Sequence, residues 1–138
     1  MTINERSLTK RERDCMVSIR EKGMEDFPLR LNELAGILKI SSPTTLNILR
    51  RLEVKGMITS SRGMIKLTET GRESADRILK IHRVYESLFC QSGVSENTAC
   101  NEASLVDYLT EEQTAEMVLH RIGDPKICPH GKPIQDDS

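Results

Sequence analysis

The sequence predicts a mainly α-helical chain, in which an N-terminal winged helix-turn-helix is followed by a helical second domain. Short segments with apolar residues at helical spacing occupy residues 9–55, and two β-prone runs around a glycine-containing loop come directly after them. A long amphipathic helical pattern and two shorter ones fill the rest of the chain. We therefore expect two domains, residues 1–70 and residues 71–138.

The first helix is expected to start after Thr9, because Thr9 and Glu12 have the spacing of a capping box, and to end at Gly23. Its buried stripe should consist of Cys15, Met16 and Ile19. A second, short helix is predicted by the helical spacing of Leu31, Leu34, Ala35 and Leu38.

The third helix should open at Ser42-Pro43, since proline is tolerated in a first turn where its missing N–H would be unpaired anyway. It should run to Lys55 and stop at Gly56, because glycine readily adopts the left-handed conformation. Residues 57–59 and 64–67 then predict a hairpin around a loop at residues 60–63.

The second half begins with a long helix over about residues 70–89, which Gly93 breaks. Two shorter helices should follow. Ser95 is expected to cap the first, and Thr110 with Gln113 has the spacing of a capping box that would open the second.

Charge divides the chain. Residues 1–83 hold 17 basic and 11 acidic residues, whereas residues 84–138 hold 3 and 10. A basic half of this kind favours a nucleic-acid partner. The attraction of two halves of one domain is the alternative explanation.

The third helix carries the residues expected to contact double-stranded DNA through the major groove. Asparagine is suited to an adenine edge, and an exposed leucine to a thymine methyl. The candidates for base contacts on the solvent-facing sides of this helix are Ser42, Thr44, Leu46 and Asn47. Phosphate contacts are expected from Lys39, Arg50, Arg51, Arg62 and Lys66. An ordinary solvated charged helix is the alternative.

Several short motifs occur in a distinctive order: Leu29-Arg30, Ser42-Pro43-Thr44, Gly56, Leu67-Thr68-Glu69-Thr70-Gly71, Lys80-Ile81-His82-Arg83 and Pro129-His130-Gly131-Lys132-Pro133-Ile134. Together they resemble the diphtheria-toxin-repressor and manganese-transport-regulator family of metal-dependent transcriptional regulators. The resemblance covers about residues 8–134 and implies a homodimeric repressor on a pseudo-palindromic operator. It also implies that the helical domain serves dimerisation and metal binding, in the two-domain form without the SH3-like domain of some members.

His82 and Glu86 lie one helical turn apart, a spacing that suits one ion but also an ordinary surface hydrogen bond. The resemblance implies an ancillary metal site at this pair, with Cys100 at the family's third ligand position and Cys128 at its anion-binding serine. These four ligands would close a tetrahedral shell, and thiolates favour zinc over iron or manganese. We expect one zinc ion per chain, with His130 as the reserve ligand.

The family's primary metal site is not expected in this chain. Its ligand positions are matched by Ser104, Asp107, Tyr108 and Arg11, of which three are poor ligands. Only a weak carboxylate site at Asp14 and Asp107 is left.

Two other functions fit parts of the sequence. Cys100 and Cys128 could form a redox pair that releases the protein from DNA as a disulfide. A thiol enzyme using Cys128 and His130 is the remote alternative, but no third orienting group stands at a recognisable spacing, so no enzyme is expected.

A cytoplasmic protein without a membrane span is expected. The first fourteen residues carry charges of both signs, and no apolar run approaches the roughly 18 residues that cross a bilayer. In the cytoplasm the four cysteines should be reduced.

Overall fold

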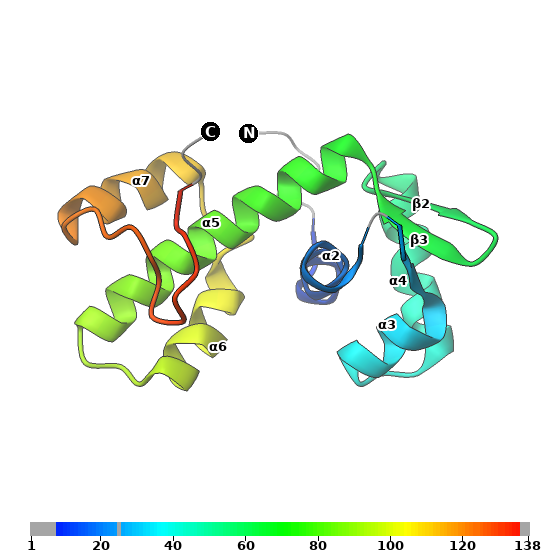
Figure 1. Cartoon of the computed structure of the whole chain (residues 1–138), viewed down its shortest axis with the longest axis horizontal. Helices are drawn as coiled ribbons and strands as arrows, with labels where there is room; N and C mark the ends of the chain where they lie inside the picture. Colours follow the sequence, from blue (N-terminus) through cyan, green and yellow to red (C-terminus); the bar gives the residue numbers. More distant parts are fainter. Residues whose placement is uncertain (1–7, 25, 136–138) are drawn as a thin grey trace. The chain divides into compact units, whose positions relative to one another are not determined.

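The computed structural model describes residues 8–24 and 26–135. These residues fall into two compact units, 8–76 and 77–135, and the division lies inside one long helix, α5 (Glu69–Gln91). Helices predominate in both units, as the sequence predicts (Figure 1).

The first unit begins with α2 (Lys10–Lys22), which starts at the predicted capping box. The Thr9 hydroxyl accepts the Glu12 N–H at 3.1 Å, and the Glu12 carboxylate accepts the Thr9 N–H at 2.8 Å. The expected stripe of Cys15, Met16 and Ile19 is buried, and Gly23 caps the end of the helix.

The helix-turn-helix consists of α3 (Leu31–Leu38) and α4 (Ser42–Val54). Ser41 is the N-cap of α4, because its hydroxyl oxygen accepts the Thr44 N–H at 3.2 Å, and Pro43 lies in the first turn. Gly56 has a φ of +77°, the left-handed conformation expected just beyond the helix end.

The wing is a three-stranded antiparallel sheet of β1 (Leu29–Arg30), β2 (Ile58–Ser61) and β3 (Met64–Leu67), in the order β1-β3-β2. The predicted loop over residues 60–63 is wrong, since β2 continues through Ser61. Arg62 and Gly63 alone form the turn, with φ of 53° and 77°. Two consecutive positive φ angles are characteristic of a type I′ hairpin turn, whose backbone matches the twist of the strands.

The second unit contains the greater part of α5, followed by α6 (Glu96–Val106) and α7 (Glu112–Arg121). Ser95 caps α6 as predicted. The capping box expected at Thr110 is wrong, because Glu111 is the N-cap of α7. The Thr110 hydroxyl instead donates to the Val106 carbonyl at 3.0 Å, at the end of α6.

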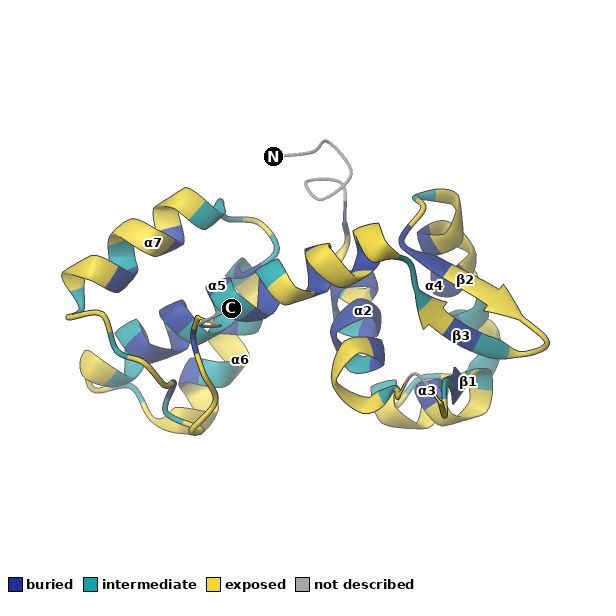
Figure 2. Ribbon diagram, turned by 45° about the horizontal axis from the view of Figure 1, so that its top comes forward, coloured by how far each residue is buried: buried dark blue, intermediate teal, exposed yellow. Residues whose placement is uncertain are grey.

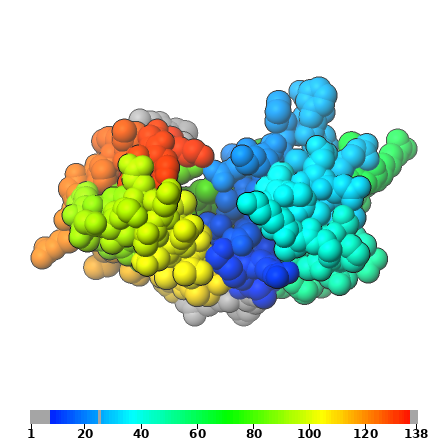
Figure 3. Space-filling model, turned by 90° about the horizontal axis from the view of Figure 1, so that it is seen from below, coloured from blue at the N-terminus to red at the C-terminus, as the bar shows by residue number. Residues whose placement is uncertain are grey.

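The core of the second unit joins α5, α7 and the tail that follows α7. Figure 2 shows the buried positions of these helices in dark blue. In the space-filling view the red tail lies against the yellow-green end of α5 (Figure 3). The buried cluster is made of Ile81, Val84, Ala115, Leu119, Cys128 and Ile134. One predicted ligand, Cys128, is therefore also a core residue.

No helix within residues 8–24 and 26–135 has the length and apolar character needed to span a membrane.

Candidate metal centre and nucleic-acid interface

The second unit brings all five predicted metal donors together around Glu86. Two three-residue groups share this carboxylate: His82, Glu86 and Cys100 form one, and Glu86, Cys128 and His130 form the other. Within each group, one ligand atom of every residue lies within 4.8 Å of the others. The donors come from α5, α6 and the tail, and the two groups meet only at Glu86, so the predicted ligands Cys100 and Cys128 belong to different groups.

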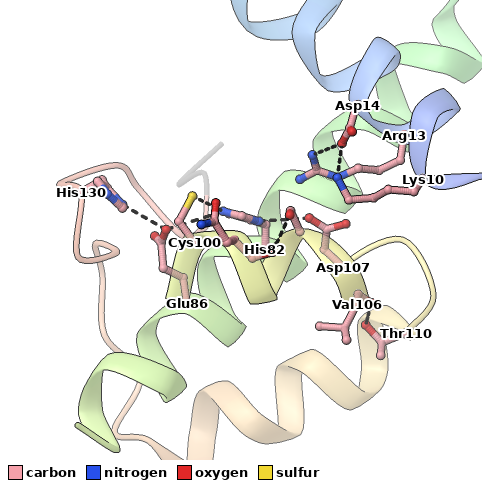
Figure 4. Close-up of polar contacts among 12 residues, drawn as sticks. Lys10, Arg13, Asp14, His82, Glu86, Cys100, Val106, Asp107, Thr110 and His130 are labelled. Atoms are coloured by element: carbon pink, nitrogen blue, oxygen red, sulfur yellow. Dashed lines mark hydrogen bonds and ion pairs between the residues drawn. The ribbon is translucent and has the colours of Figure 1, made fainter. Parts of the chain in front are cut away.

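One oxygen of Glu86 faces both imidazoles (Figure 4). Glu86 Oε2 lies 3.6 Å from His82 Nε2 and 3.0 Å from His130 Nδ1. The same His82 Nε2 lies 3.6 Å from the sulfur of Cys100. His130, expected only as a reserve ligand, is therefore the histidine nearer to Glu86.

The donors fit a thiophilic divalent cation. The Glu86 side chain is 2% exposed and Cys128 is 4% exposed, while the imidazoles of His82 and His130 keep 12% and 39% exposure. A buried carboxylate is normally paired with a cation or bound to a metal, because burying an isolated charge is costly. Two imidazoles, two thiols and one carboxylate are the ligand types that zinc takes in proteins.

Backbone hydrogen bonds within the tail fix the turn that carries Cys128 and His130, two members of the second donor group. The Gly131 N–H donates to the Cys128 carbonyl at 2.8 Å, and the Cys128 N–H donates to Lys132 at 2.8 Å, which closes a tight turn. Gly131 has a φ of +80°, which favours glycine at this position. Arg83 of α5 donates to the Pro133 carbonyl at 2.8 Å and so ties the turn to the helix that carries Glu86.

The two carboxylates of the expected weak second site each have partners within their own unit. Asp14 is paired with Lys10 at 2.6 Å and with Arg13 at 3.0 Å. Asp107 is fully buried, and its Oδ2 lies 3.0 Å from His82 Nδ1.

In the first unit, α4 presents the predicted polar face. Its buried side consists of Thr45, Ile48, Leu49 and Leu52. Asn47, Arg50 and Arg51 are exposed, and Ser42 and Thr44 are half-buried. Lys39, Arg62 and Lys66 are also exposed. The expectation of an exposed Leu46 is wrong, since this side chain is half-buried beside the buried face of the helix.

Some of these polar side chains already have partners. The Ser42 hydroxyl donates to Asn32 at 2.9 Å, and the Ser41 hydroxyl donates to the Thr44 hydroxyl at 2.8 Å. Arg51 Nε lies 3.7 Å from Glu12 Oε2, although the Arg51 side chain stays 51% exposed.

Glu12 also joins α2 to the end of α4, a role that the sequence does not indicate. Lys55 Nζ, just after α4, donates to both oxygens of the fully buried Glu12 at 2.9 Å. Burial alone would raise the pKa of Glu12, but the hydrogen bonds from Lys55 and Thr9 and the charge of Lys55 hold that pKa below its ordinary value. In the sequence Glu12 signals only a helix cap.

Most of the chain is similar in sequence to known proteins. The chain is 31% identical over 108 residues to an uncharacterized HTH-type transcriptional regulator of Aeropyrum pernix, and the match covers 76% of this chain and 59% of the relative. It is 27% identical over 118 residues to the diphtheria toxin repressor of Corynebacterium diphtheriae, covering 84% and 51%. The chain thus spans between half and three fifths of the length of these relatives.

Comparison with solved structures shows the same fold in another protein. The crystal structure of a hypothetical protein from Sulfolobus solfataricus superposes with a TM-score of 0.75 at 29% identity, over 94% of this chain and 100% of the other. The family described as "Iron dependent repressor, metal binding and dimerisation domain" matches residues 68–136, which is half of this chain. The chain therefore belongs to the diphtheria-toxin-repressor family of metal-dependent repressors.

Proposed function

We propose that the protein is a dimeric, metal-dependent transcriptional repressor that binds double-stranded DNA and is not an enzyme. The observation that carries the proposal is that the chain has both an outward polar face on α4 in the first unit and, in the second unit, five metal donors around the buried Glu86. The names of its relatives, a transcriptional regulator and a repressor, agree with this function.

In the proposed complex, α4 lies in the major groove. Asn47 contacts an adenine edge, and Ser42 and Thr44 contact bases or phosphates. Leu46 reaches a thymine methyl only with the exposed part of its half-buried side chain. The phosphates are held by Lys39, Arg50, Arg51, Arg62 and Lys66. Two copies of the chain would dock on half-sites about 34 Å apart in a pseudo-palindromic operator.

For the metal we propose one zinc ion per chain, rather than iron or manganese. His82, Glu86, Cys100 and Cys128 would hold it, with His130 as the alternative ligand. When bound, the ion supplies positive charge beside the buried Glu86 and a cross-link between segments. The ion would connect α5, which carries His82 and Glu86, to α6 through Cys100 and to the tail turn through Cys128.

The experiment combines metal analysis with DNA binding. Metal-free protein is titrated with zinc, and its affinity for a duplex selected from a random-sequence pool is followed by fluorescence anisotropy. We expect one zinc per chain and tighter DNA binding in the zinc form. Folded protein whose DNA affinity is unchanged by zinc would contradict a regulatory metal. Undetectable binding to any duplex at low ionic strength would contradict the repressor itself.

The redox alternative has less support. Neither of the two donor groups in the described residues contains both Cys100 and Cys128. Thiol counting before and after mild oxidation tests it, since loss of two thiols together with release from DNA would favour a disulfide. For the thiol enzyme, Cys128 at 4% exposure offers little access to a substrate.

A further inference from the structure

Each ring nitrogen of His82 faces a residue of α6 or of its C-terminal cap. Cys100 Sγ lies 3.6 Å from Nε2, and Asp107 Oδ2 lies 3.0 Å from Nδ1 (Figure 4). Cys100 belongs to α6, and Asp107 is the residue that caps its C-terminus. Seven residues, about two helical turns, separate them, so both side chains point to the same side of α6.

The Asp107 contact favours one of the two neutral tautomers of His82. A carboxylate accepts hydrogen bonds, so the favoured tautomer has its N–H on Nδ1 and its lone pair on Nε2. Nε2 is the atom that faces Glu86 and Cys100. A metal-ligating imidazole commonly donates its other N–H to a carboxylate, which fixes the tautomer and the ring orientation.

The burial of Asp107 supports this role over that of a surface ion pair. Asp107 is fully buried, and the His82 side chain is 12% exposed. A contact shielded from water holds the ring more firmly than an exposed one, since solvent does not compete for the N–H.

We propose that Asp107 is a positioning residue, which holds His82 in the Nδ1–H form and directs Nε2 to the metal without binding the metal itself. The proposal rests on the metal site put forward above. It gives α6 two functions, a ligand in Cys100 and the orientation of a second ligand through Asp107.

The first test uses zinc-free wild-type protein. Long-range ¹H–¹⁵N correlation spectra distinguish the two neutral tautomers, and we expect His82 to carry its proton on Nδ1. This measurement needs neither metal nor a variant. A signal from the Nε2–H form would overturn the proposal.

The second test measures zinc affinity by competition with a chromophoric chelator. Asp107→Asn should bind zinc about 10–100-fold more weakly than wild type. Its zinc-free His82 signal should also move toward the Nε2–H form, a change that a merely structural role would not produce. The matched control is Glu102→Gln, which removes one carboxylate charge from an exposed position of α6 and should leave zinc affinity unchanged.

His82→Ala and Cys100→Ser separate the two proposals. If they lose zinc while Asp107→Asn binds it as tightly as wild type, the positioning role is refuted and the metal site stands. If wild type binds no zinc, or if His82→Ala and Cys100→Ser bind it normally, the metal site itself is refuted.

Discussion

Glu12→Gln should destabilise the first unit by about 2 kcal/mol at neutral pH. Glutamine keeps an oxygen for the Thr9 N–H but removes the charge that binds Lys55 at 2.9 Å through both oxygens. Hydrogen bonds to charged groups contribute about 1.5–3 kcal/mol. Breaking a fully buried ion pair costs up to about 5 kcal/mol, but the Lys55 side chain is 22% exposed and can be rehydrated, so the lower range applies.

The pH dependence of this difference follows from the lowered pKa of Glu12. A group whose folded-state pKa is depressed stabilises the fold above its unfolded pKa, which is about 4.5 for glutamate, and the stabilisation disappears as the pH falls through the folded value. The difference in free energy of unfolding between wild type and Glu12→Gln should therefore have its full value at pH 7 and become smaller as the pH falls below about 4.5.

Urea unfolding followed by circular dichroism at several pH values is the assay. Glu53→Gln, which removes a carboxylate from an exposed position of the neighbouring α4, is the control. A loss at pH 7 no larger than that of Glu53→Gln would refute the anchoring role of Glu12. A difference that stays constant down to pH 3 would refute the electrostatic explanation.

Three further predictions concern the metal, the DNA face and the core thiol. Zinc at 100 times its dissociation constant should raise the free energy of unfolding by about 2.7 kcal/mol in thermal melts. This gain should vanish in Cys100→Ser but persist in His120→Ala, whose imidazole is 80% exposed. Arg50→Ala should weaken DNA binding and reduce the salt slope by about 1, whereas Arg121→Ala, on the exposed side of α7, should leave the slope unchanged in anisotropy titrations. Burial and the negative charges of Glu12 and Asp14 raise the pKa of Cys15 to about 12, so thiol reagents at pH 8 should label Cys15 only after unfolding, as peptide mass spectrometry can show.

Local signals made the helices predictable. The capping box at Thr9, the serine and proline before α4 and the glycine after it act through neighbouring backbone atoms, so sequence alone reveals them. The same pattern at Thr110 failed, because the end of α6 lies close by and offers its Val106 carbonyl to the threonine hydroxyl. A competing acceptor from the preceding helix is invisible in a local pattern.

The sequence predicts which residues are candidate metal donors, but it does not predict the contacts between them. Residue types and the family resemblance predict His82, Glu86, Cys100 and Cys128 as ligands, and the other three lie in the two donor groups that share the Glu86 carboxylate. The short distance from His130 to Glu86 depends on the tail turn and its bond to Arg83, which join residues about 50 positions apart. The contact of Asp107 with His82 likewise depends on how α6 packs against α5, although its two-turn spacing from Cys100 was a signal available in the sequence.

The two-residue turn at Arg62 and Gly63 has a consequence for the entropy of complex formation. Because the strands on either side fix its backbone, a ligand that reaches this tip has to immobilise only the arginine side chain. The entropic penalty of association is therefore smaller than it would be for a flexible loop that carries the same charge. Lengthening the tip by a few glycines would keep every atom of the guanidinium and still weaken binding, since preorganisation, not charge, would be lost.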